Sequence, residues 1–167
     1  MFENKQIEQL PDIEELVFKG IQKAYLKVLF IHLLLSFSIA FTGLFLLITY
    51  KLQEDVLVYE SYLYVAVLSV FLFTSLIIIV GFSKRKYALR EKDISYKSGI
   101  FFKKTTTVPF SRVQHVEVDE GPVSRIFKLA SINVFTAGDS SNDLEIKGIE
   151  KIEALRIKEF ISQKINE

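Results

Sequence analysis

Two long apolar runs dominate the first half of the chain. Residues 28–50 and residues 61–82 each contain no charged side chain. At 1.5 Å of rise per residue, a helix over either run reaches roughly 33 Å, enough to cross a hydrocarbon core of roughly 30 Å. The pattern therefore predicts a transmembrane helical hairpin over residues 28–82. Buried helices of a soluble all-α core are the weaker interpretation, because core helices keep a polar stripe.

The charges around these runs are distributed asymmetrically. Residues 51–60, between the two runs, hold one base and three acids, whereas residues 83–104 hold eight bases and two acids. Loops rich in Lys and Arg stay preferentially in the cytoplasm. We therefore expect both termini to be cytoplasmic.

Residues 1–27 predict a cytoplasmic segment that contains an amphipathic helix. Asp12 and Glu15 have the spacing of a capping box, and apolar residues follow at helical intervals. Lys19, Lys23 and Lys27 would then share one face, from which they could reach lipid phosphates.

From Lys86 onward the apolar period shortens to that of strands. Candidate strands are Tyr87–Arg90, Ile94–Lys97, Phe102–Val108, Val113–Asp119, Ile132–Thr136 and Leu144–Ile146. Turn signals between and after them include Gly121-Pro122 and Gly148, and Glu150–Ile165 has the pattern of a closing helix. Residues 83–167 therefore predict a strand-rich cytoplasmic domain with one C-terminal helix.

Several short motifs in this domain occur in a recognisable order. They are Arg112-Val113-Gln114-His115-Val116, Glu120-Gly121-Pro122-Val123-Ser124-Arg125, the stretch from Leu129 to Gly138, Ser140-Ser141, Glu145-Ile146 and Gly148-Ile149. Together with the preceding helical hairpin, they resemble the bacterial pleckstrin-homology-like domain of the YdbS-like, DUF304-type family of membrane proteins.

The resemblance implies a fold and a location. We expect a membrane-anchored α+β protein, in which a bent antiparallel PH-like sheet of seven strands is capped by the C-terminal helix. Only six strands are evident, so the seventh is expected around residues 124–128. The resemblance also implies a multi-pass protein of the bacterial cytoplasmic membrane, with a larger multi-domain membrane relative as a partner.

Catalytic groups are scarce. The chain has no cysteine and only two histidines. His32 lies in an apolar run without any acid or base, which favours a neutral side chain bonded between helices or reaching to the interface. His115 has Glu117 nearby but no evident nucleophile, and residues 139–143 lack the spacing of a calcium loop. We expect no enzyme activity, cofactor or metal.

Two binding functions remain, and a protein-interaction module ranks first. Its candidate residues are Arg112, Gln114 and Arg125, and a homo-oligomer stays open. The alternative is an anionic-lipid sensor that uses the bases nearest the bilayer: Lys84, Arg85, Lys86, Lys103 and Lys104. The turn at residues 90–93 alternates in charge, which argues against the headgroup pocket of eukaryotic PH domains. Nucleic acid is not expected, because residues 105–167 are mildly acidic.

Overall fold

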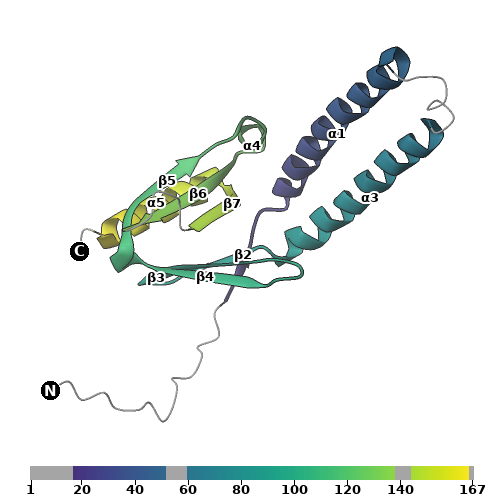
Figure 1. Cartoon of the computed structure of the whole chain (residues 1–167). Coiled ribbons are helices and arrows are strands. Elements are labelled where there is room, and N and C mark those ends of the chain that lie inside the picture. The colour runs from purple at the N-terminus through teal and green to yellow at the C-terminus, as the bar shows by residue number, and fades with distance from the viewer. Residues whose placement is uncertain (1–16, 52–59, 138–143, 166–167) are drawn as a thin grey trace, which may run out of the picture.

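Two long helices project side by side from a small β-rich domain (Figure 1). The computed structural model describes residues 17–51, 60–137 and 144–165. Helix α1 (Ala24–Lys51) and helix α3 (Glu60–Lys84) are long and apolar enough to cross a membrane. No residue of α3 is buried, so α3 is not a core helix of a soluble protein.

The two helices contact each other through aromatic side chains. Phe37 of α1 and Phe71 of α3 pack edge to face with ring centroids 5.1 Å apart, and Phe41 packs against Tyr64 at 5.3 Å. Large apolar side chains elsewhere on both helices point outward, as expected for helices surrounded by lipid.

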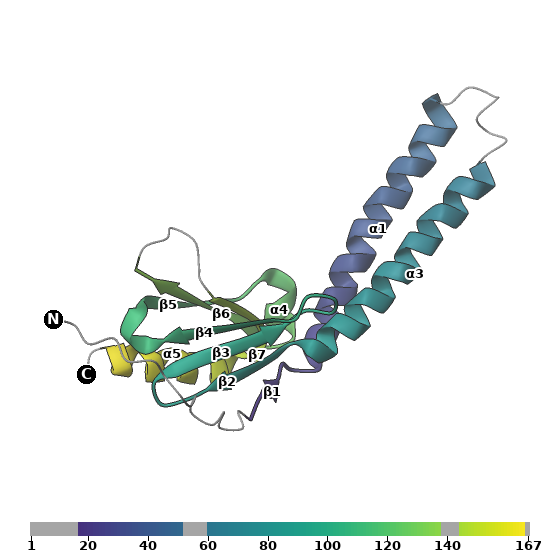
Figure 2. The ribbon, with the colours of Figure 1, turned by 60° about the horizontal axis from the view of Figure 1, so that its bottom comes forward.

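Within the described residues, seven strands form two antiparallel sheets (Figure 2). The strands are β1 (Lys19–Gly20), β2 (Lys86–Leu89), β3 (Asp93–Ser98), β4 (Lys104–Pro109), β5 (Val113–Asp119), β6 (Leu129–Thr136) and β7 (Leu144–Glu150). The first sheet has the order β1-β2-β3-β4, and the second has the order β5-β6-β7. A short helix, η1 (Phe110–Arg112), joins them, and α5 (Lys151–Ile165) closes the domain.

The predicted fold class is confirmed, with six strands and the closing helix near their expected positions. The expected position of the seventh strand was wrong. Residues 122–126 form the short helix α4 (Pro122–Ile126), because a proline in the first turn suits a helix start. The seventh strand is β1, which pairs with Lys86 and Tyr87 of β2.

The N-terminal prediction also needs correction. Lys19 and Gly20 form a strand, so the expected amphipathic helix does not include them and the three lysines do not share a helical face. Asp12 and Glu15 lie outside the described residues. The local apolar spacing was misleading, because tertiary pairing with β2 overrides a weak local preference for helix.

The hydrophobic core lies between the two sheets and α5. Its most deeply buried side chains include Ile94, Ile132 and Ile161. Residues from the other end of the chain complete it: Ile21, Tyr25 and Val28. The backbone N–H of Gln22 also donates to the carbonyl oxygen of Gly148 at 2.8 Å. The β-rich domain is therefore assembled from segments on both sides of the helical hairpin.

A polar cluster fastens β1 to the closing helix. The ammonium group of Lys19 and the hydroxyl of Tyr87, the latter at 2.7 Å, both donate to Oε1 of Glu153 in α5. Burial and the bond to Glu153 raise the pKa of Tyr87 far above its ordinary value. Burial alone would raise the pKa of Glu153, but these two bonds and the charges of Lys19 and Arg156 lower it. The carboxylate is thus held ionised between its two donors.

Candidate anionic-ligand site beside the end of α3

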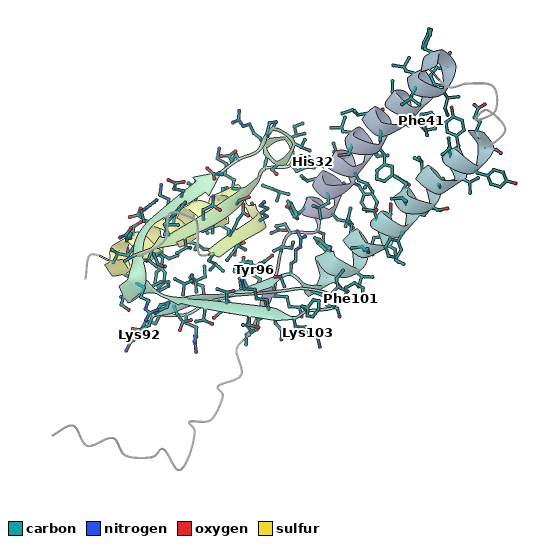
Figure 3. The ribbon with its side chains drawn as sticks, in the orientation of Figure 1. His32, Phe41, Lys92, Tyr96, Phe101 and Lys103 are labelled. Carbon is teal, nitrogen blue, oxygen red and sulfur yellow. The ribbon has the colours of Figure 1, made fainter. Side chains whose placement is uncertain are left out.

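Four lysines surround one cavity where the first sheet meets the end of α3. This cavity, called the lysine cavity below, has a volume of about 430 Å³. It is lined by Lys84, Lys86, Lys97 and Lys103, together with Phe18, Ser83, Ser98 and Gly99. None of these lining residues is acidic. Figure 3 shows Lys103 just below the lower end of α3. A cavity lined by four cations, with no carboxylate among its described lining residues, is suited to an anion.

The strand register brings these lysines together. Lys86 of β2 and Lys97 of β3 are directly opposite each other in the antiparallel pair, so their side chains share one face of the sheet. Lys84 ends α3 two residues earlier, and Lys103 leads into β4. Like charges directly opposite are unfavourable in a sheet, and a bound anion would remove that repulsion.

An aromatic ring lies against one of these bases. The ammonium nitrogen of Lys97 is 5.7 Å from the ring centroid of Phe18, a distance typical of a cation–π contact. Phe18 is a lining residue that directly precedes β1. The N-terminal segment therefore contributes to this cavity as well as to the core.

The five bases predicted for lipid contact do not all lie at the same cavity. Lys84, Lys86 and Lys103 line the lysine cavity, whereas Arg85 lines a different cavity with Tyr96 and Ile100. Lys104 does not line either one. Lys97 was not among the predicted bases, because it has no basic neighbour in the sequence. Pairing the two candidate strands as a hairpin could have found it, because Lys86 and Lys97 are opposite one another across a short turn.

The turn between β2 and β3 lies at the other end of the same strands. Figure 3 shows Lys92 there, far from Lys103 and from α3. The guanidinium of Arg90 makes two bonds to the carboxylate of Asp93, Nε to Oδ1 at 2.9 Å and the second to Oδ2 at 2.7 Å. Its charge is thus neutralised within the turn, as the alternating sequence indicated.

Comparison with known proteins assigns the chain to a family. The profile of the bacterial PH domain matches residues 26–165, which include both long helices and nearly the whole β-rich domain. The chain belongs to the bacterial PH domain family. The resemblance seen in the sequence is confirmed.

Two relatives from Bacillus subtilis (strain 168) match the chain. The UPF0699 transmembrane protein YdbS is 35% identical over 78 residues, which cover 47% of this chain and 47% of YdbS. The UPF0699 transmembrane protein YdbT is 28% identical over 87 residues, which cover 52% of this chain and 18% of YdbT. The matched part thus spans about half of YdbS and a smaller part of the longer YdbT.

One solved structure is also similar. It is the crystal structure of a DUF1696 family protein with a pleckstrin-homology domain from Shewanella loihica PV-4. The TM-score is 0.38 at 15% sequence identity, over 48% of this chain and 70% of that chain.

The three residues proposed for partner binding do not form one surface of the PH domain. All three side chains are exposed. Arg112 ends η1 just before β5, whereas Arg125 lies in α4 just after it, so the two occupy opposite ends of that strand. Gln114 is the extra residue of a bulge between Val113 and His115. Arg125 is the one nearest the long helices, since α4 contacts α1.

The histidines show no catalytic arrangement in the described part of the PH domain and its helices. Nδ1 of His32 is 2.8 Å from the carbonyl oxygen of Val28, so the bond of this ring nitrogen lies within α1. His115 stacks on Phe135 with ring centroids 4.3 Å apart, and its Nε2 lies 3.6 Å from Oε1 of Glu117, with both side chains exposed.

The described residues also contain no group of three or more side chains able to hold a metal ion. Residues 139–143, considered for calcium, fall outside them.

Proposed function

We propose that this chain is an integral membrane protein whose PH domain binds the phosphate headgroup of an anionic lipid in the lysine cavity. The observation that carries the proposal is the convergence of Lys84, Lys86, Lys97 and Lys103 on one cavity, whose lining in the described part of the chain includes no acid. The sequence favoured a protein-interaction module over a lipid sensor. We reverse that order, because the three residues proposed for partner binding are dispersed whereas the four lysines lie around one cavity.

The position of the cavity supports a lipid as the source of the phosphate. Lys84 both ends α3 and lines the cavity, so the cavity lies where a membrane-crossing α3 would leave the hydrocarbon. Each base near an anionic membrane surface contributes around 1 kcal/mol of attraction. With both termini in the cytoplasm, as the charge asymmetry indicates, the cavity faces the leaflet that is richer in anionic lipid.

Neutralising two lysines of the cavity should distinguish lipid binding at this site from attraction by the overall positive charge of the domain. We expect Lys97→Gln with Lys103→Gln to weaken retention of anionic lipid by roughly 10- to 30-fold, from about 1 kcal/mol for each base. The full chain would be purified from nanodiscs that contain a minority of phosphatidylglycerol, and retained lipid would be counted by native mass spectrometry.

Lys92→Gln with Lys158→Gln is the matched control, since both lysines are exposed and neither lines the cavity. It should retain the lipid. An equal loss in both double variants would refute a defined site. Displacement of the lipid by millimolar inorganic phosphate would instead identify free phosphate as the ligand.

A protein partner is a second candidate, favoured by an open strand edge. β1 pairs only with Lys86 and Tyr87, so Ala88 and Leu89 have no strand partner on that edge in the described part of the chain. Beside them, a groove of about 640 Å³ runs along α5, and Ile152 in it is 58% exposed. An extended segment of a larger membrane relative could add to β2 there, with apolar side chains in the groove.

Ile152→Glu tests this second candidate. Co-expressed with a tagged larger relative of the same family, the wild-type chain and the control Lys158→Glu should both co-purify with it, whereas Ile152→Glu should not. Lipid retention should be the same in all three. Co-purification that is unaffected by Ile152→Glu would exclude this groove.

A further inference from the structure

The tip of the β3–β4 hairpin carries two adjacent phenylalanines that the core does not use. Phe101 is 83% exposed and Phe102 is 90% exposed, the highest values among the aromatic side chains of the described residues. Exposing two neighbouring large aromatic side chains to water is unfavourable, because burying their apolar surface lowers the free energy. Such a pair indicates a surface that contacts something apolar.

The hairpin tip lies beside the last turns of α3, before the helix ends at Lys84. A Cβ placed on Gly81 would be 3.2 Å from Cδ1 of Ile100, so Ile100 packs closely against this helix. Ile77 and Ile78 line a cavity together with Gly81 and Ile100. Ile77 is seven residues before Lys84, so this cavity extends about 10 Å back along α3 from its end.

A glycine allows the tight turn at the hairpin tip. Gly99 has φ +108°, which a side-chain-bearing residue rarely adopts, and a Cβ at this position would collide with the carbonyl oxygen of Phe102. Lys103 and Lys104 follow the two aromatic residues directly. Figure 3 shows Phe101 close beneath the lower part of α3.

We propose that Phe101 and Phe102 insert into the boundary between the headgroups and acyl chains of the bilayer that α3 crosses. Aromatic side chains followed by lysines are the composition that this boundary favours, with rings at the acyl level and ammonium groups among the phosphates. The hairpin tip then fixes the orientation of the PH domain against the membrane. This inference rests on the membrane crossing of α3 but not on headgroup binding.

The chain contains no tryptophan, so one introduced tryptophan reports on a single position. Three full-length variants would be placed in phosphatidylcholine vesicles, with or without bromine on the upper acyl chain: Phe102→Trp, Phe73→Trp within α3, and Ile152→Trp on α5. Neutral lipid is chosen because headgroup binding at the lysine cavity needs an anion.

Phe102→Trp is expected to show blue-shifted emission and a loss of intensity on bromination that approaches the loss of Phe73→Trp. Ile152→Trp should be unaffected by bromine and quenched by aqueous iodide. If Phe102→Trp behaves like Ile152→Trp, or is shielded from both quenchers as in a protein contact, the proposal is wrong. A Phe73→Trp variant without bromine quenching would instead refute the membrane crossing on which the proposal rests.

Discussion

Replacing Gly148 by alanine is expected to lower the free energy of unfolding of the PH domain by roughly 2–5 kcal/mol. Gly148 lies inside β7 with φ +81°, although the sequence suggested that it marks a turn. A Cβ at this position would lie 2.5 Å from Cγ of Tyr25, which is itself buried. Backbone strain and a collision with a core ring therefore act together. Thermal or denaturant unfolding followed by circular dichroism would measure the loss.

Two further variants make this prediction specific. Gly121→Ala is the matched control, because the Cβ would meet only Ser124 Oγ at 3.9 Å and the backbone φ of −65° suits any residue. It should change the unfolding free energy little. Since Tyr25 is the obstacle, the losses caused by Gly148→Ala and Tyr25→Ala should add to more than the loss of the double variant. Full additivity would show that the two residues do not interact.

The PH domain is also expected to depend on residues that precede the first long helix. Ile21, Tyr25 and Val28 are all buried in its core. At roughly 1.5–3 kcal/mol for each buried side chain, their removal approaches the 5–15 kcal/mol that stabilises a typical domain. A fragment of residues 84–167 alone should therefore melt without cooperativity, or at a much lower denaturant concentration than a chain in which a flexible linker joins residues 17–30 to residues 84–167.

The joined chain also provides its own control. Ile21→Ala with Tyr25→Ala in that chain should bring its midpoint down toward that of the fragment, whereas Lys23→Ala, at an exposed position, should not. Equal denaturant midpoints for the joined chain and the fragment would mean that residues 17–30 do not stabilise the domain.

Local pattern predicted most of the fold, and the failures share one cause. The apolar runs and the alternation in β5 depend on near neighbours, so they could be recognised from the sequence. β1 is only two residues long and is stabilised by β2 and Glu153, far away in the chain. Gly148 likewise looks like a turn residue until Tyr25 is known to lie against it. Such features depend on contacts across long sequence separations.

In the candidate site, too, some residues could be recognised from local sequence and others only from contacts between distant segments. Charge runs next to the second apolar helix identified Lys84, Lys86 and Lys103, because proximity to a membrane can be inferred from position alone. Lys97 required the β2–β3 register, and Phe18 required β1. Arg112 and Arg125 were grouped because they belong to neighbouring motifs, yet a strand separates them. Residues that are close in sequence do not share a surface when an extended strand intervenes.

The central claim is that an anionic headgroup occupies the lysine cavity, and paramagnetic relaxation of lipid phosphorus tests it most directly. The chain has no cysteine, so Thr105→Cys provides a unique position for a spin label. Thr105 is directly opposite Lys97 across the β3–β4 pair, which places the label beside the cavity without replacing a lining residue. In nanodiscs of phosphatidylcholine with a minority of phosphatidylglycerol, we expect the label to relax the phosphatidylglycerol phosphorus more strongly, per molecule, than the phosphatidylcholine phosphorus. Equal enhancement of the two signals would contradict the claim.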